Sequence, residues 1–157
     1  MSIGPGNGGC LFANGLVNTM RTDIREHDSY IRVRYAETDR MGFLHHSQYF
    51  VYFELGRTEM LRAQGFAYKD IEDAGHYLVV VKLDCKFKLP ARYDDLLKLR
   101  TILVRTTPVR IEHRYELWRD HQLLAEGQST LACVDRDGRL QAIPDILNMD
   151  DDVRSRS

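Results

Sequence analysis

The sequence predicts an α+β fold in which a curved antiparallel β-sheet wraps around one long central α-helix. Only one stretch, from Ser47 to Gln64, has a long helical pattern of apolar residues. From Val81 onward the chain consists of segments in which apolar and polar residues alternate, and short turns join them. Because one helix cannot cover both faces of such a sheet, a sheet curved around that helix is the economical arrangement.

The 157-residue chain has the composition of a single soluble domain, with 43% hydrophobic and 29% charged residues. Its net charge of −1 argues against a dedicated nucleic-acid-binding protein. No apolar run is long enough to span a membrane, and the N-terminus lacks the pattern of a secretory signal. The three cysteines, Cys10, Cys85 and Cys133, are widely spaced and fit a reducing compartment. These observations predict a cytoplasmic protein.

The chain divides into three parts. Residues 1–27 begin with a Gly- and Asn-rich run, and this composition predicts a poorly ordered extension. Residues 28–147 form the predicted domain, and residues 148–157 form a polar tail. The apolar residues of the extension could instead pack on a neighbouring subunit: Leu11, Phe12, Leu16 and Val17.

The central helix has one wide apolar face and ends at a glycine. We expect Ser47 to cap its start and Gly65 to adopt the left-handed conformation after its end. Two i,i+3 pairs, Glu54/Arg57 and Glu59/Arg62, are expected to form ion pairs on its surface. The predicted apolar face comprises Tyr49, Tyr52, Phe53, Gly56, Met60 and Ala63, broadened by Phe50, Val51 and Leu61.

The remaining elements follow from alternation and turn residues. A half-buried strand is predicted at Tyr30–Tyr35 and a short helix at Tyr68–Ala74. In the strand predicted at Leu123–Asp135, small residues such as Gly127 favour close approach of a helix backbone. The later strands are predicted at Val81–Leu89, Leu96–Thr106, Ile111–Arg119, Leu123–Asp135 and Leu140–Ile143.

One motif lies directly before the central helix and continues into it. It reads YAETDRMG from Tyr35 to Gly42, followed by His46 and Tyr49, with RTEML at residues 57–61. This pattern resembles the 4-hydroxybenzoyl-CoA thioesterase family of the hotdog fold, and within it the YbgC-like acyl-CoA thioesterases. The resemblance extends from about Tyr30 to Ile146 and includes the turn PARYDD at residues 90–95.

The resemblance implies the site residues. Asp39 corresponds to the family's catalytic carboxylate, and the backbone amide at the helix start, which polarises the thioester carbonyl, falls at His46. The His46 imidazole is also implicated in this branch. Glu37 stands where the branch has Asp, and residues 43–45 differ from its usual sequence. The substrate-binding residues that we expect are Gly42, Phe43 and Tyr49.

These residues suit thioester hydrolysis. A helix N-terminus offers free N–H groups and about half a positive charge, and an oxyanion donor of this type contributes ~3–4 kcal/mol to lowering the barrier. Asp39 could attack the carbonyl or act as base for water; it could also be merely a loop residue or a helix cap. Tyr35 could hydrogen-bond Asp39 or line the acyl pocket, or it could be a core tyrosine.

No metal and no separate cofactor are predicted, since coenzyme A would be part of the substrate. His45 and His46 are adjacent and should point differently, and no standard ligand spacing completes a metal site. The lysines at positions 82, 86 and 88 are expected to form a solvated strand face, with binding of the CoA phosphates as the alternative.

Three functions are open at this point. The first is an acyl-CoA thioesterase acting on a short-chain aliphatic or aromatic acyl group. The second is a hydroxyacyl dehydratase of the same fold, which would pair a His with a helix carboxylate. The third is a non-catalytic module that binds acyl-CoA or acyl carrier protein. The uncovered sheet face and edges favour a dimer, and the resemblance implies a homotetramer built as a dimer of dimers.

Overall fold

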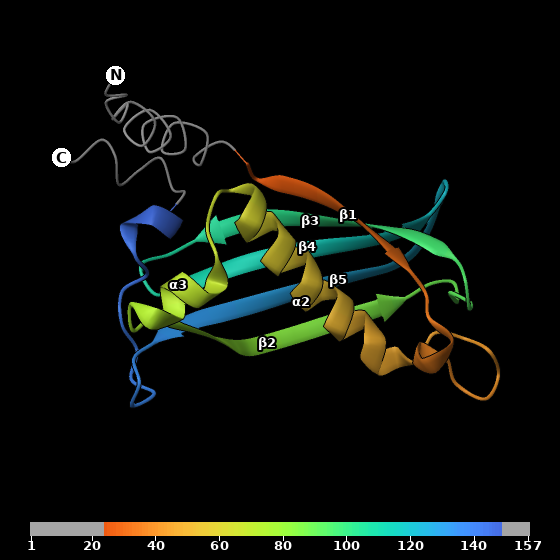
Figure 1. The fold of residues 1–157 in the computed structure, drawn as a ribbon, viewed down its shortest axis with the longest axis horizontal. Coiled ribbons are helices and arrows are strands. Elements are labelled where there is room, and N and C mark those ends of the chain that lie inside the picture. Colours follow the sequence, from red (N-terminus) through yellow and green to blue (C-terminus); the bar gives the residue numbers. More distant parts are fainter. Residues whose placement is uncertain (1–23, 149–157) are drawn as a thin grey trace, which may run out of the picture.

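The computed structural model describes residues 24–148, so the predictions for the extension and the tail fall almost entirely outside the described residues. The chain forms one antiparallel sheet of five strands in the order β1-β3-β4-β5-β2, crossed by the long helix α2 (Figure 1). The strands are β1 (Glu26–Arg32), β2 (Tyr77–Phe87), β3 (Leu96–Thr106), β4 (Arg110–Arg119) and β5 (Gln122–Val134). The helices are α2 (His46–Ala63) and α3 (Tyr68–Asp73), with short 3₁₀ turns at η1 (Tyr35–Glu37) and η2 (Asp145–Leu147).

Helix α2 confirms the predicted centre of the fold, with differences at both ends. It begins two residues earlier than a cap at Ser47 predicts, because His45 caps it instead: the His45 Nδ1 accepts the Ser47 N–H at 3.2 Å. Gly65 follows the helix at φ 92°, as predicted. The apolar face is buried at Tyr49, Tyr52, Phe53, Gly56 and Met60.

Three expectations for the surface of α2 were wrong. Ala63 is exposed, and Val51 is 51% exposed because it faces away from the sheet. Arg57 forms no ion pair with Glu54, since its Nη1 donates instead to the hydroxyl of Tyr115 on β4 at 3.1 Å. The Glu59–Arg62 ion pair is present.

The contact between α2 and the sheet depends on two glycines. A Cβ on Gly56 would lie 2.7 Å from Leu99 Cδ2 and would overlap the Thr101 hydroxyl. A Cβ on Gly127 of β5 would overlap the ring of Phe53. Phe53 stacks on Tyr115 with 4.4 Å between ring centroids. The small residue predicted for close approach therefore lies directly under the helix.

The inner faces of β3, β4 and β5 are buried as predicted, but the outer strands differ. The side chains expected to form the core face of β2 are partly exposed, with Val81 at 52% and Phe87 at 50%. The reason is that β2 pairs only with β5 and forms an edge of the sheet. The strand predicted at Tyr30–Tyr35 lies at Glu26–Arg32, and Tyr35 belongs to η1.

The predicted final strand at Leu140–Ile143 is absent from the described part of the chain. Only one bridge forms there, between Val134 and Leu140, although the turn before it is present with Gly138 at φ 80°. Ile143 and Leu147 instead pack into a second apolar cluster with Met60 and Ile71. This segment closes the end of the core that lies under the C-terminal half of α2.

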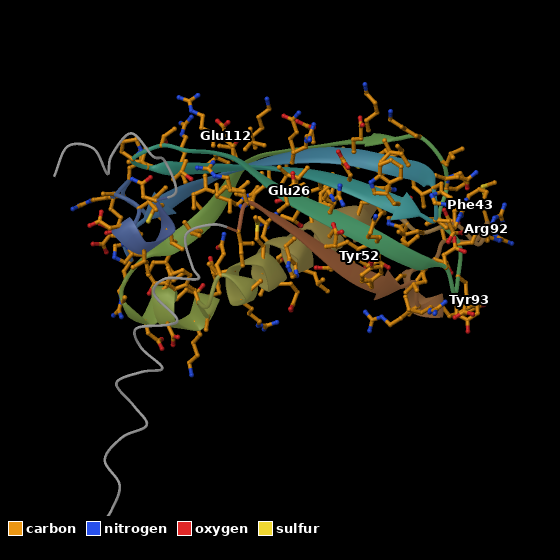
Figure 2. The ribbon with its side chains drawn as sticks, turned by 90° about the horizontal axis from the view of Figure 1, so that it is seen from above. Glu26, Phe43, Tyr52, Arg92, Tyr93 and Glu112 are labelled. Carbon is orange, nitrogen blue, oxygen red and sulfur yellow. The ribbon has the colours of Figure 1, made fainter. Side chains whose placement is uncertain are left out.

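All described helices lie on one side of the sheet (Figure 2). The opposite face carries side chains that no described element covers. Within residues 24–148, no helix is long and apolar enough to cross a membrane. Along the length of the molecule, the loop before α2 lies at one end and the second apolar cluster lies at the other.

Candidate active site

The motif before α2 folds into a small hairpin between residues 37 and 45. The Asp39 N–H donates to the Phe43 carbonyl at 2.7 Å, and the Gly42 N–H donates to the Asp39 carbonyl at 3.0 Å. Gly42 has φ 81°, a conformation that glycine adopts without strain. At the open end of the hairpin, the His45 N–H donates to the Glu37 carbonyl at 2.9 Å. The hairpin therefore leads directly into the start of α2.

The Asp39 carboxylate is exposed and held by its own turn. Its Oδ1 accepts the N–H groups of Met41 at 2.9 Å and Phe43 at 3.1 Å. Its Oδ2 accepts no hydrogen bond from any described residue. The alternative of a helix cap does not hold, because His45 caps α2. One oxygen thus orients the carboxylate, and the other is open to solvent.

Glu37 is a second carboxylate with a different environment. It is buried and accepts hydrogen bonds from the Tyr52 hydroxyl at 2.7 Å, the Arg34 backbone at 2.8 Å and the Arg34 side chain at 3.0 Å. Burial alone would raise the pKa of Glu37, but these hydrogen bonds outweigh it and lower the pKa. Burial and the neighbouring carboxylate raise the pKa of Tyr52. Glu37 therefore ties the motif to the buried face of α2.

A second loop supports the hairpin. The Leu44 N–H donates to the Ala91 carbonyl at 2.8 Å, and Phe43 and Arg92 form a backbone bridge. The Arg92 guanidinium lies 4.7 Å from the centroid of the Phe43 ring, and both residues lie at the same end of the molecule (Figure 2). Sequence reasoning identified this loop as part of the resemblance but gave it no role.

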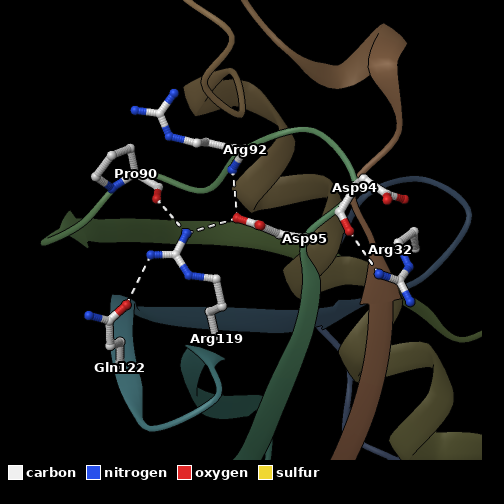
Figure 3. Close-up of polar contacts among 7 residues, drawn as sticks. All are labelled: Arg32, Pro90, Arg92, Asp94, Asp95, Arg119 and Gln122. Carbon is white, nitrogen blue, oxygen red and sulfur yellow. Dashed lines mark hydrogen bonds and ion pairs between the residues drawn. The ribbon is translucent and has the colours of Figure 1, made fainter.

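The supporting loop is fixed by charged hydrogen bonds (Figure 3). The Asp95 carboxylate accepts from the Arg92 N–H at 2.9 Å and from Arg119 Nη1 at 2.8 Å. Arg119 also donates to the Pro90 carbonyl at 3.2 Å and to the Gln122 side chain at 3.0 Å. Because Arg119 is the last residue of β4, these contacts hold the loop that supports the hairpin against the end of the sheet.

The start of α2 presents two histidines. The rings of His45 and His46 lie in contact, with 4.1 Å between centroids and a tilt of 32° between their planes, which corrects the expectation that these neighbours point differently. The His46 N–H, at the first position of the helix, donates to no acceptor within residues 24–148. The same residues hold no group of three or more His, Cys, Asp or Glu side chains suited to a metal ion.

The two tyrosines of the motif lie apart from the Asp39 carboxylate. Tyr35 is 77% exposed and packs edge-to-face on Tyr93 with 5.7 Å between centroids. It is therefore not a core tyrosine, and its hydroxyl makes no hydrogen bond to Asp39. Tyr49 is buried and packs edge-to-face on Phe87 at 4.8 Å. The hairpin thus brings together Asp39, Gly42 and Phe43 but neither tyrosine.

The predicted solvated lysines lie along β2 and just after it. Lys82, Lys86 and Lys88 are all exposed, and Lys88 lies 3.6 Å from the Glu126 carboxylate. The exposure agrees with a solvated face. Binding of CoA phosphates by these lysines stays a prediction.

Comparisons with known proteins identify the family. A model of the Thioesterase-like superfamily matches residues 33–156. The chain is 33% identical to the acyl-CoA thioester hydrolase YbgC of Escherichia coli O157:H7 over 107 residues, which are 67% of this chain and 79% of YbgC.

Similar solved structures support the same family. The protein TT1821 of Thermus thermophilus is 39% identical with a TM-score of 0.73, covering 77% of this chain and 92% of that one. A DHNA-CoA thioesterase of Staphylococcus aureus is 28% identical with a TM-score of 0.72, covering 74% and 80%. The chain belongs to the Thioesterase-like superfamily of hotdog-fold thioester hydrolases, which confirms the predicted family, fold and enzyme class.

Proposed function

We propose that this protein hydrolyses the thioester bond of a short-chain aliphatic or aromatic acyl-CoA, with Asp39 as the reacting carboxylate. The single observation that carries the proposal is the carboxylate's geometry. Two backbone N–H groups fix one oxygen of Asp39, while the other is free and exposed, just before the start of α2. The similarity to YbgC, named an acyl-CoA thioester hydrolase, supports the substrate class.

The reaction uses two groups: the Asp39 carboxylate on the hairpin and the backbone N–H of His46, where the hairpin joins α2. The free Oδ2 of Asp39 attacks the thioester carbonyl, the C–S bond breaks, and CoA leaves as a thiolate that takes a proton from water. Water then hydrolyses the resulting mixed anhydride and regenerates the carboxylate. In the alternative route, Asp39 removes the proton from an attacking water molecule. In both routes the N–H of His46 stabilises the developing oxyanion with the positive end of the helix dipole.

Assembly and location belong to the same proposal. The unpaired outer edge of β2, with its half-exposed valines, supports a dimer formed between sheet edges. We infer a homotetramer made from two such dimers, with the active site between subunits, in the cytoplasm. Substrates carried on acyl carrier protein are a further inference from the same chemistry.

The test is a panel of aliphatic and aromatic acyl-CoAs incubated with the purified protein, with free thiol as the readout. We expect saturable thiol release from at least one member of the panel. 3-Hydroxyacyl-CoA and enoyl-CoA substrates form the second arm. Loss or addition of water without thiol release would indicate the dehydratase, and saturable binding of acyl-CoA without any turnover would indicate a binding module; either result would contradict the proposal.

A further inference from the structure

A cavity lies at the other end of α2 from the Asp39 hairpin. It has a volume of about 230 Å³ and lies between the C-terminal half of α2 and the inner face of the sheet. Its wall is mostly apolar and includes Met60, Leu103, Ile111 and Leu131. A dry apolar cavity of about 150 Å³ holds one benzene molecule, so this one accommodates about nine non-hydrogen atoms.

Two polar side chains in the wall, Arg57 and His113, have unused capacity for hydrogen bonds or ion pairs. Arg57 donates to the Tyr115 hydroxyl at 3.1 Å, which lies 2.6 Å from the Ser129 hydroxyl. No carboxylate of residues 24–148 forms an ion pair with the Arg57 guanidinium. His113 is only 8% exposed, and its Nδ1 has no hydrogen-bond partner. Burial, and secondarily the charge of Arg57, lowers the pKa of His113 to about 3, so its ring is neutral near pH 7.

The cavity is separate from the candidate active site. Arg57 lies eleven positions after His46, or roughly 16 Å along the helix axis. Neither Asp39 nor His46 lines the cavity. The remaining charged residue of the wall, Glu54, is exposed and one turn before Arg57, and it leaves the guanidinium unpaired.

We propose that this cavity is a second binding site, for a small apolar carboxylate such as an aromatic or medium-chain carboxylic acid. The guanidinium of Arg57 offers a forked pair of donors that matches a carboxylate. A neutral imidazole at His113 can donate one more hydrogen bond in the suitable tautomer. The apolar wall takes the ring or chain of the ligand. The ligand would supply the partners that both polar groups lack.

Isothermal titration with benzoate tests the site, with benzamide as the uncharged ligand of the same shape. We expect benzoate to bind the wild-type protein at one site per chain and Arg57→Gln to weaken this binding at least tenfold, with little effect on benzamide. Glu54→Gln should strengthen benzoate binding, because it removes a negative charge that repels the carboxylate of benzoate. Arg62→Gln removes the same charge from an exposed position of the same helix, and it should bind benzoate as the wild type does.

The second binding site does not rest on the proposed thioesterase function, and the variant Asp39→Asn tests the two separately. Benzoate binding should persist in Asp39→Asn, and thioesterase turnover should persist in Arg57→Gln. Unchanged benzoate affinity in folded Arg57→Gln, or no saturable binding to the wild type, would overturn the second site. If Arg57→Gln does not fold, magnetisation transfer from benzoate to the methyl groups of Leu103, Ile111 and Leu131 in the wild type decides the question, and its absence is equally fatal.

Discussion

Two carboxylates only two residues apart have opposite environments. Asp39 is exposed with one free oxygen, whereas Glu37 is buried and bonded to Tyr52 and Arg34. The residue difference from the YbgC-like pattern therefore falls on a structural position. The longer Glu side chain reaches the Tyr52 hydroxyl and the Arg34 guanidinium together. The family resemblance pointed to Asp39, but the sequence could not predict that Glu37 is buried, because burial of a loop carboxylate depends on the helix packed beneath it.

Glu37→Gln should lower stability more than it lowers turnover. The amide keeps one acceptor but loses the charge that Arg34 and Tyr52 bond, which should cost roughly 2–3 kcal/mol in the free energy of unfolding. Urea denaturation and acyl-CoA turnover, measured on the same preparation, check this. Tyr52→Phe is the matched control, since it removes one partner of the same carboxylate. A stable Glu37→Gln protein with a larger loss of turnover than Asp39→Asn would show that Glu37 is the reacting group.

His113 gives the stability a defined pH dependence. Its folded pKa of about 3 lies below the usual value of 6.5, so the unfolded chain binds the extra proton between these two values. The free energy of unfolding should therefore fall as the pH falls through this window, by up to roughly 1.4 kcal/mol per pH unit from this group. His113→Gln should flatten that slope in denaturation curves, whereas exposed His121→Gln should not. Parallel slopes for wild type and His113→Gln would refute this assignment.

At the level of elements, the fold depends on how closely α2 approaches β5. Gly127→Ala places a methyl group against the Phe53 ring, which is itself stacked on Tyr115. Such overpacking should cost about 1–3 kcal/mol of stability. Thermal melting measures the loss, with Gln128→Ala at an exposed position of the same strand as a control that adds no atoms to the core. A Gly127→Ala protein as stable as the wild type would show that the helix can shift away without cost.

The inner strands and α2 could be predicted because alternation and helical periodicity report burial directly. Leu97, Leu99 and Tyr115 are fully buried where the pattern placed them. The edge strand β2 could not be predicted in the same way, since its alternation is identical and only pairing reveals that it lies at an edge. The position of β1 was missed because its pairing with β3, from Glu26 to Arg32, includes polar residues that show no apolar period.

At the scale of the whole molecule, the outer edge of β2 should form the dimer contact. Val81→Glu should shift the protein toward a smaller assembly, because each edge would place a carboxylate beside its symmetry mate. Light scattering measures the change. Val104→Glu is the matched control, since Val104 is 53% exposed but belongs to an inner strand. A wild-type protein that is monomeric and fully active at all concentrations would contradict the assembly.

The central claim is that Asp39 carries out the chemistry. Asn matches Asp in shape and can still accept the N–H groups of Met41 and Phe43, so the hairpin should survive in Asp39→Asn. Asn is neither an anionic nucleophile nor an effective base, and loss of a general base alone should cost ~10²–10⁴ in rate.

The most direct measurement is the turnover of the best acyl-CoA substrate by Asp39→Asn, together with its melting temperature and its affinity for a non-hydrolysable acyl-CoA analogue. We predict a loss of turnover of about a hundredfold or more, with melting and analogue binding close to those of the wild type. Near-normal turnover in a folded Asp39→Asn protein would contradict the mechanism.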